Sequence, residues 1–171
     1  MQNVVLVGMM GSGKTTIGKL VAKELGYRFL DTDEMIQESQ GCTIEDIFFY
    51  AGESFFRKLE TDLIKGMTNE KNVVLSTGGG IVTVEGNMDL LKAIGRVFYL
   101  DVNPELVFSR ISGSLKRPLL KDPENKRENF MKIFNERKGL YMQADVVVSN
   151  NSNIKEKMVA KIMENLIDNQ A

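Results

Sequence analysis

The chain has 171 residues, a length that suits one domain with a core large enough to fold without disulfide or metal cross-links. It carries 22 lysines and arginines against 23 aspartates and glutamates, so its formal net charge of -1 excludes the global basic field on which nucleic-acid and anionic-membrane binding rely. Histidine is absent and cysteine occurs once, which excludes internal disulfides, thiolate zinc clusters, histidine triads and imidazole bases. Carboxylates, lysines and arginines must therefore carry any chemistry.

The single cysteine, Cys42, fits a reducing compartment, and we expect it to be a half-buried structural thiol. No apolar run approaches the ~18 residues of a membrane span, and the N-terminus has neither a charged segment nor a cleavage site. The sequence shows no heptad or apolar stripe that demands a dimer. We therefore expect a cytoplasmic monomer with no membrane or nucleic-acid partner.

The first predicted element is a short buried strand, Val4 to Val7, followed at once by a glycine-rich loop. Residues 8–16 read Gly-Met-Met-Gly-Ser-Gly-Lys-Thr-Thr and complete the pattern G-x-x-x-x-G-K-S/T, and a helical pattern then runs from Lys14 to Leu25. In this context backbone N–H groups close around phosphate oxygens, Lys14 reaches the outer phosphates and the Thr15 hydroxyl can hold Mg²⁺. The loop predicts nucleotide binding, and the alternative is a glycine-rich turn without a ligand.

Four further strands and six helices follow in the sequence pattern. The predicted strands are 27–30, 73–76, 97–100 and 146–148. The predicted helices are 43–50, 53–67, 87–94, one that begins at Asn103-Pro104-Glu105, 130–141, and a C-terminal helix from Ile154. Five short apolar runs separated by helices predict a doubly wound, three-layer α/β fold with a five-stranded parallel sheet, whose ligands bind outside the carboxyl ends of the strands.

The segment between residues 112 and 125 breaks the apolar periodicity with glycine and proline. We expect a mobile lid loop over 112–124 inside a single domain, 1–171, because no linker or repeat interrupts the chain. Arg110, Lys116 and Arg117 flank or occupy this loop. A closing arginine such as Arg117 can stabilise charge on a transferring phosphoryl group, whereas Lys116 fits a solvated loop residue.

Asp31 and Asp33 follow the second predicted strand and lie two residues apart, so in an extended segment they face the same way. If that strand adjoins the first, both lie close to the phosphate loop, where one carboxylate can serve Mg²⁺ and the other the substrate. An alcohol that attacks a γ-phosphoryl group needs an acceptor for its proton, which Asp33 can supply. The alternative for Asp33 is a helix N-cap, and spacing alone does not separate the two roles.

Arg57 and Glu60 stand three residues apart in a predicted helix, where the carboxylate can hold the guanidinium in one orientation. An arginine held in this way is a good receptor for an acidic substrate, because guanidinium and carboxylate form a bidentate fork. Base rates favour the other interpretation, a solvated surface pair. Arg137 lies in a mixed charged helix whose ordinary interpretation is also a surface face.

Thr77 is followed by three glycines, Gly78, Gly79 and Gly80, at the end of a predicted strand. A plain turn needs one glycine, and three suggest a backbone that must approach a ligand or adopt positive φ. Their bare N–H groups could bind substrate hydroxyls. A turn without a ligand stays open as the alternative.

Together, six motifs resemble shikimate kinase, and they occur in the family's order over nearly the whole chain. They are the phosphate loop at 8–16, Asp31-Thr32-Asp33, Phe-Arg-Lys-Leu-Glu at 56–60, Thr-Gly-Gly-Gly at 77–80, Arg-Pro-Leu-Leu at 117–120, and Glu136-Arg137 followed by Tyr141. The resemblance implies a fold of the P-loop NTPase and nucleoside-monophosphate-kinase type. It also implies ATP-dependent phosphorylation of the 3-hydroxyl of shikimate in aromatic amino-acid biosynthesis.

The resemblance implies roles on the nucleotide side. Arg117 would be the lid cation on the phosphates, and Arg110 would stack on adenine. Asp31 would assist the Mg²⁺ ion through water. The residues of the phosphate loop that would cradle ATP, with Lys14 catalytic and Thr15 on Mg²⁺, are Gly11, Ser12, Gly13, Lys14, Thr15 and Thr16.

On the substrate side the resemblance implies that helices within about 33–66 bind shikimate. Asp33 would be the base at the reacting hydroxyl. Arg57 and Arg137 would bind the shikimate carboxylate, with Glu60 orienting Arg57. The backbone of the loop Gly78–Gly80 would meet the ring hydroxyls, and the assignment rests on its last two glycines.

One segment departs from the family pattern. Residues 149–153 read Ser-Asn-Asn-Ser-Asn, where many members carry a basic residue or a proline near the adenine. Two rival functions remain: another small-metabolite kinase, such as a gluconate or nucleoside-monophosphate kinase, and a catalytically silent kinase-like binding protein. Arg57, Arg137 and the triple glycine argue against the first function. The second is disfavoured because the charged residues that catalysis would need are all present, namely Lys14, Asp33, Arg57, Arg117 and Arg137.

Overall fold

The computed structural model describes residues 2–112, 124–149 and 154–167. Its centre is a parallel five-stranded sheet in the order β2-β3-β1-β4-β5. The strands are β1 (Val4–Val7), β2 (Arg28–Asp31), β3 (Val73–Ser76), β4 (Arg96–Asp101) and β5 (Val146–Ser149). All four pairings between neighbouring strands are parallel, as the sequence pattern predicts.

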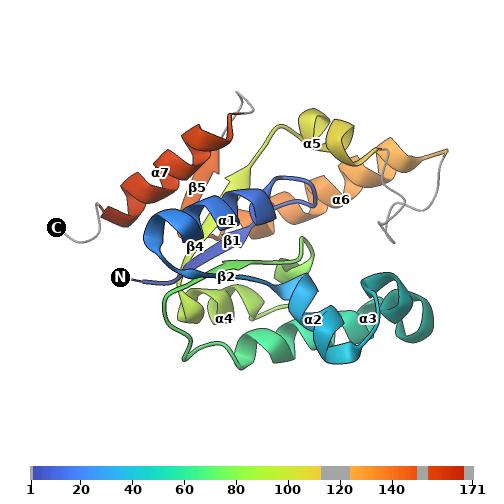
Figure 1. Cartoon of the computed structure of the whole chain (residues 1–171). Helices are drawn as coiled ribbons and strands as arrows, with labels where there is room; N and C mark the ends of the chain where they lie inside the picture. Colours follow the sequence, from blue (N-terminus) through green and yellow to red (C-terminus); the bar gives the residue numbers. More distant parts are fainter. Residues whose placement is uncertain (1, 113–123, 150–153, 168–171) are drawn as a thin grey trace.

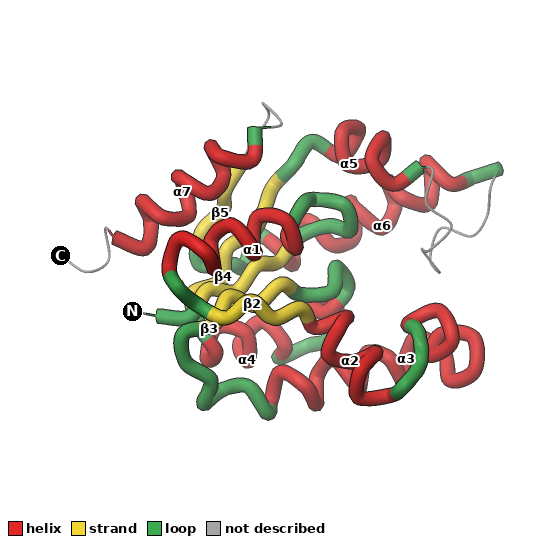
Figure 2. Tube along the Cα trace, viewed as in Figure 1, coloured by secondary structure: helices red, strands yellow, loops and turns green. Residues whose placement is uncertain are grey.

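Helices cover both faces of this sheet and give three layers (Figure 1). Helices α1 and α7 pack against each other on one face, and α4 packs against β1 and β4 on the other (Figure 2). The helices are α1 (Lys14–Leu25), α2 (Thr32–Gln40), α3 (Ile44–Lys65), α4 (Asn87–Ile94), α5 (Pro104–Ile111), α6 (Lys126–Tyr141) and α7 (Lys155–Ile167), with a 3₁₀ turn η1 (Ile81–Thr83) after β3. The doubly wound α/β fold is thereby confirmed.

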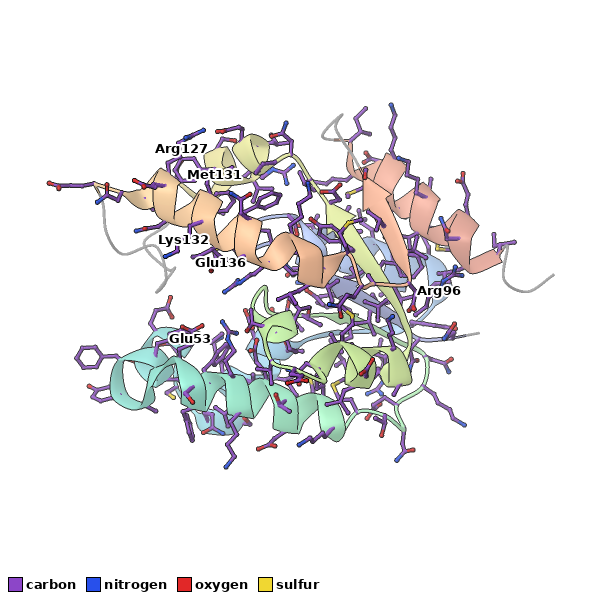
Figure 3. All side chains as sticks on the ribbon, turned by 180° about the vertical axis from the view of Figure 1, so that it is seen from behind. Glu53, Arg96, Arg127, Met131, Lys132 and Glu136 are labelled. Carbon is purple, nitrogen blue, oxygen red and sulfur yellow. The ribbon has the colours of Figure 1, made fainter. Side chains whose placement is uncertain are left out.

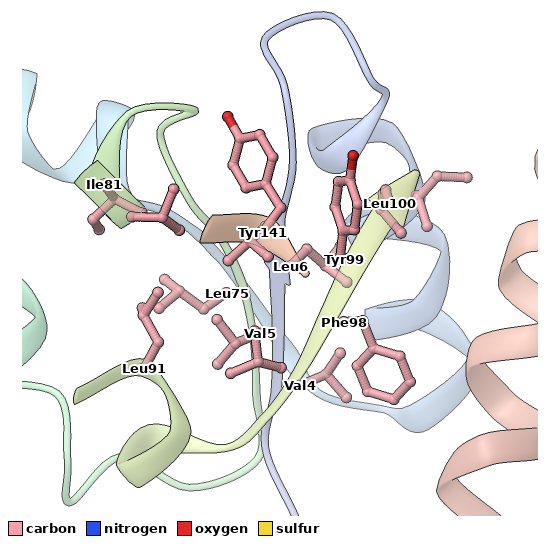
Figure 4. Close-up of a cluster of buried hydrophobic side chains, with 14 of the residues drawn as sticks. Val4, Val5, Leu6, Leu75, Ile81, Leu91, Phe98, Tyr99, Leu100 and Tyr141 are labelled. Atoms are coloured by element: carbon pink, nitrogen blue, oxygen red, sulfur yellow. The ribbon is translucent and has the colours of Figure 1, made fainter. Parts of the chain in front are cut away.

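The core explains why the strands read as continuous apolar runs. Every residue of β1 is fully buried, because helices cover both of its faces. Figure 4 shows side chains of β1 and β4, among them Tyr99, packed with Leu91 of α4 and with Tyr141 of α6. Those tyrosine rings stack with centroids 5.1 Å apart, which joins α6 to the sheet beside the loop that follows β3.

Several element boundaries differ from the predicted ones. Strand β2 begins and ends one residue later than expected, and α6 begins at Lys126 instead of residue 130. The two helices predicted at 43–50 and 53–67 form one element, α3, with a break at Gly52, whose φ of 84° and ψ of 170° are not helical. The predicted interruption between the two helical patterns is confirmed at Gly52.

The strand order shows that the second strand does not adjoin the first, which was the condition for placing Asp31 and Asp33 near the phosphate loop. Strand β2 pairs with β3 and not with β1, so Asp31 is not on a neighbour of the first strand. The carboxyl ends of β1, β2 and β3 nevertheless meet at one edge of the sheet, where the phosphate loop follows β1, Asp31 ends β2 and Thr77 follows β3. In the described residues, no helix is long and apolar enough to cross a membrane.

Candidate active site

The loop between β1 and α1 forms a cradle at the N-terminus of a helix. Gly13 is the N-cap of α1 and adopts a φ of 96°, a conformation that side chains rarely tolerate. Lys14 is buried and its Nζ donates to the carbonyl oxygens of Gly8 at 2.8 Å and Met9 at 3.0 Å. The ammonium thus lies over the loop, where the helix dipole and backbone N–H groups favour an anion.

A pocket of about 560 Å³ opens over this loop. Of the predicted nucleotide-side residues, it brings together 11–16 and Arg110, next to Asp31, Asp33 and the first two loop glycines. The residues that line it are Met10, Gly11, Ser12, Gly13, Lys14, Thr15, Thr16, Ile17, Asp31, Asp33, Ser76, Thr77, Gly78, Gly79, Val102, Arg110, Lys155 and Met158. Lys155 and Met158 come from α7 and were not predicted as site residues. No local motif marks them, because they reach the pocket only through the packing of α7 on α1.

Asp31 links the phosphate loop to α2. One carboxylate oxygen accepts from Thr15 Oγ1 at 2.9 Å, and the other accepts from the backbone N–H of Asp33 at 3.0 Å. The second bond makes Asp31 the N-cap of α2. The capping alternative considered for Asp33 is therefore wrong, and the Asp33 carboxyl group lines the pocket instead.

Arg57 forms ion pairs with two glutamates of its own helix. Its Nη1 lies 2.5 Å from Glu60 Oε2, and its Nη2 lies 3.1 Å from Glu53 Oε1. The Arg57 side chain is only 11% exposed and that of Glu60 is fully buried, whereas Glu53 is 49% exposed. The interpretation of Arg57 and Glu60 as a solvated surface pair, favoured by base rates, is therefore wrong.

Burial dominates the electrostatics of this pair. Burial raises the pKa of Glu60 to about 7, although the charge of Arg57 and its hydrogen bond act in the opposite direction. The nearby Asp33 adds to this rise and Arg137 reduces it, so four charged groups lie close together. Burial alone would lower the pKa of Arg57, but Glu60 and Glu53 outweigh it and raise the pKa, so the guanidinium stays charged.

The three-glycine loop after β3 lies against all of these groups. A Cβ atom on Gly78 would stand 2.5 Å from Glu60 Oε1 and 2.7 Å from Asp33 Oδ1, and one on Gly80 would stand 2.1 Å from Arg57 Nη2. Real Cβ atoms essentially never stand so close, so any other residue at these positions would force the Glu60, Asp33 or Arg57 side chain to move. This finding favours the ligand-approach interpretation over a plain turn.

Arg137 reaches the same loop from α6. A Cβ atom on Gly79 would lie 3.7 Å from Arg137 Nη1, and the Tyr141 hydroxyl donates to the Gly79 carbonyl oxygen at 2.5 Å. Arg137 is 6% exposed, so the ordinary interpretation of its helix as placing it on a surface face is wrong. Arg57 and Arg137, both largely shielded from solvent, therefore lie against one glycine loop.

Other predicted residues lie elsewhere. Arg110 is exposed at the pocket and donates to the Gly11 carbonyl oxygen at 3.1 Å. Arg117, Lys116 and nearly all of the predicted lid at 112–124 lie outside the described residues, as do residues 150–153. Cys42 is exposed, which contradicts its expected half-buried structural role.

A parallel sheet with this phosphate loop at its carboxyl edge, next to paired aspartates and buried arginines, defines an ATP-dependent P-loop kinase of small molecules. The family model described as shikimate kinase matches residues 10–167. The chain therefore belongs to the shikimate kinase family.

Individual relatives agree with this assignment. The shikimate kinase of Persephonella marina is 44% identical over 163 residues, which cover 95% of this chain and 98% of the relative. The structure of shikimate kinase from Acinetobacter baumannii in complex with shikimate matches with a TM-score of 0.93 and 37% identity, covering 99% of this chain and 94% of that one. A deoxyadenosine kinase from M. mycoides, 17% identical with a TM-score of 0.59 and covering 96% and 98% of the two chains, shares the fold.

Proposed function

We propose that this protein transfers the γ-phosphoryl group of ATP to the 3-hydroxyl of shikimate, which gives shikimate 3-phosphate and ADP in aromatic amino-acid biosynthesis. One observation carries the proposal. Beside the phosphate-loop pocket, Asp33, Glu60, Arg57 and Arg137 converge on one glycine loop from three different helices. This arrangement suits a small substrate that has a carboxylate at one end and a hydroxyl near the phosphates.

On the nucleotide side, the backbone of residues 11–16 binds the ATP phosphates and Lys14 moves from the loop carbonyls to the outer phosphates. Thr15 Oγ1 and Asp31 Oδ2, 2.9 Å apart, offer the hydroxyl and carboxylate oxygens that Mg²⁺ prefers. We assign Thr15 to direct coordination and Asp31 to contact through water. A Mg²⁺ ion held there would neutralise negative charge that develops on the phosphates.

On the substrate side, Arg57 and Arg137 bind the shikimate carboxylate, and Glu60 fixes the orientation of Arg57 through the buried 2.5 Å contact. The N–H groups of Gly79 and Gly80 meet ring hydroxyls. Asp33 accepts a hydrogen bond from the 3-hydroxyl, and its carboxylate takes the proton as the oxygen attacks the γ-phosphorus.

Part of the proposal rests on sequence alone. Arg117 is the lid cation on the phosphates, and the loop 112–124 closes over the site within a single kinase domain. Arg110 contacts the adenine, which its exposed position at the pocket allows. We further propose a cytoplasmic monomer without nucleic-acid or membrane partners, in line with its near-neutral charge.

The test is Mg²⁺-dependent release of ADP from ATP by the purified chain, with shikimate, gluconate, nucleoside monophosphates or no acceptor offered separately. Turnover with shikimate alone is the expected result. Turnover with another acceptor would overturn the assignment of Arg57 and Arg137. Binding of ATP without any turnover would favour a silent binding protein.

A further inference from the structure

The guanidinium of Arg57 contacts two glutamates and keeps one nitrogen without a hydrogen-bond partner among the described residues. Nη1 contacts the fully buried Glu60, and Nη2 contacts Glu53 at 3.1 Å. The third nitrogen, Nε, is buried and has no hydrogen-bond partner among the described residues. A buried donor without an acceptor is unfavourable, so this nitrogen indicates that a ligand completes the site.

The nitrogens Nε and Nη2 form one edge of the guanidinium, and such an edge can bind both oxygens of a carboxylate. Glu53 occupies this edge through Nη2 only. Its single contact leaves half of the bidentate edge unused, whereas a carboxylate of a bound molecule could satisfy both nitrogens. The remaining nitrogen, Nη1, is already paired with Glu60.

The two glutamates differ in how easily they can leave Arg57. Glu60 has no exposed surface and cannot reach water without opening the structure. Glu53 is 49% exposed and lies on the side of α3 that faces α6, where Figure 3 labels it opposite Lys132 and Glu136. An exposed carboxylate can exchange an ion pair for hydration at little cost. Glu53 is therefore the partner that can be displaced.

We infer that Glu53 occupies the substrate-carboxylate position on Arg57 in the empty enzyme, and that the incoming acid must displace it. The inference rests on the proposed role of Arg57 as receptor for the shikimate carboxylate. Glu53 then sets the affinity and the selectivity of the site. An acid replaces the lost ion pair with a bidentate one, whereas a neutral acceptor has nothing to offer Arg57.

Glu53→Gln tests this role, because glutamine keeps the size of the side chain and removes its charge. The dissociation constant and KM for shikimate should fall roughly two- to fivefold, the range that corresponds to an exposed ion pair. The value of kcat and the KM for ATP should not change. The methyl ester of shikimate, which lacks the carboxylate charge, should bind the parent and the variant equally in calorimetry.

Asp62→Asn is the matched control, since Asp62 is an exposed acid of the same helix and makes no ion pair within the described part of the chain. It should leave shikimate affinity unchanged, which excludes a general effect of the lost charge. Unchanged shikimate binding by Glu53→Gln would overturn the inference, and weaker binding would overturn it and make Glu53 an orienting residue. Failure of the proposed function is a separate result: shikimate would then not be a substrate, or Arg57→Ala would bind it as the parent does.

Discussion

Asp31 and Asp33 stand two residues apart at the end of β2 and perform different tasks. In the empty site both carboxylate oxygens of Asp31 accept hydrogen bonds, one from the Thr15 hydroxyl and one from the first turn of α2. Asp33 presents its carboxyl group to the pocket, next to the position of Gly78. The capping bond of Asp31 fixes the helix that carries Asp33, so the two roles depend on each other.

Asp33→Asn should lower kcat with shikimate by at least ~10²-fold, because the amide cannot accept the hydroxyl proton. The affinity for ATP, measured by calorimetry, should stay near that of the parent, since Asp31 and the phosphate loop are untouched. Glu34→Gln, a change at the exposed neighbour on α2, serves as the control and should retain full turnover. A variant at Asp33 with normal kcat would remove this residue from the reaction.

At the scale of elements, the loop between β3 and η1 decides where Arg57 lies. Gly80→Ala would place a methyl group 2.1–2.5 Å from three atoms of the guanidinium, so Arg57 must move away. Because a charge-assisted hydrogen bond contributes about 1.5–3 kcal/mol, we expect the KM for shikimate to rise at least ~10-fold. Steady-state kinetics at saturating ATP would show this, with the KM for ATP little changed.

The control for this change is Gly139→Ala on α6, where a Cβ atom would meet nothing within 4 Å. Alanine is the better helix former, so this variant should be more stable by up to about 1 kcal/mol and should keep its shikimate KM. If Gly80→Ala also keeps its KM, the loop does not position Arg57. The comparison therefore separates a general response to added methyl groups from a local one.

The same elements show how far a sequence can be interpreted. The strands, the phosphate loop and the break at Gly52 follow from apolar periodicity and from glycine, which are local properties. The burial of Arg57 and Arg137 does not, because helical spacing says which residues share a face and not what covers that face. Only the packing of α3 and α6 around one glycine loop makes both arginines interior. For the same reason, the position of Lys155 of α7 at the pocket could not be predicted from the sequence.

For the whole molecule, positive and negative charges nearly balance, yet several charged side chains are clustered around the buried Glu60. Glu60 is fully buried, and burial raises its pKa to about 7, whereas its value in the unfolded chain is near 4.5. A carboxyl group whose pKa is higher in the folded state binds protons more tightly there. The stability that it contributes is therefore present below the unfolded pKa and is lost as the pH rises through the folded pKa.

Glu60→Gln isolates this contribution, because glutamine does not titrate and still offers an oxygen to Arg57. Between pH 5 and pH 8 the free energy of unfolding of the empty parent should fall relative to that of the variant by about 2–3 kcal/mol. Urea unfolding of both proteins at the two pH values measures the difference, in which the other titrating groups cancel. A difference independent of pH would mean that Glu60 is ionised throughout, and that the attraction of Arg57 outweighs burial.

A fall of the expected size would show that the empty site is itself a source of instability near neutral pH. A fold that keeps a buried carboxylate there accepts this cost to hold its arginine in place for an anionic substrate.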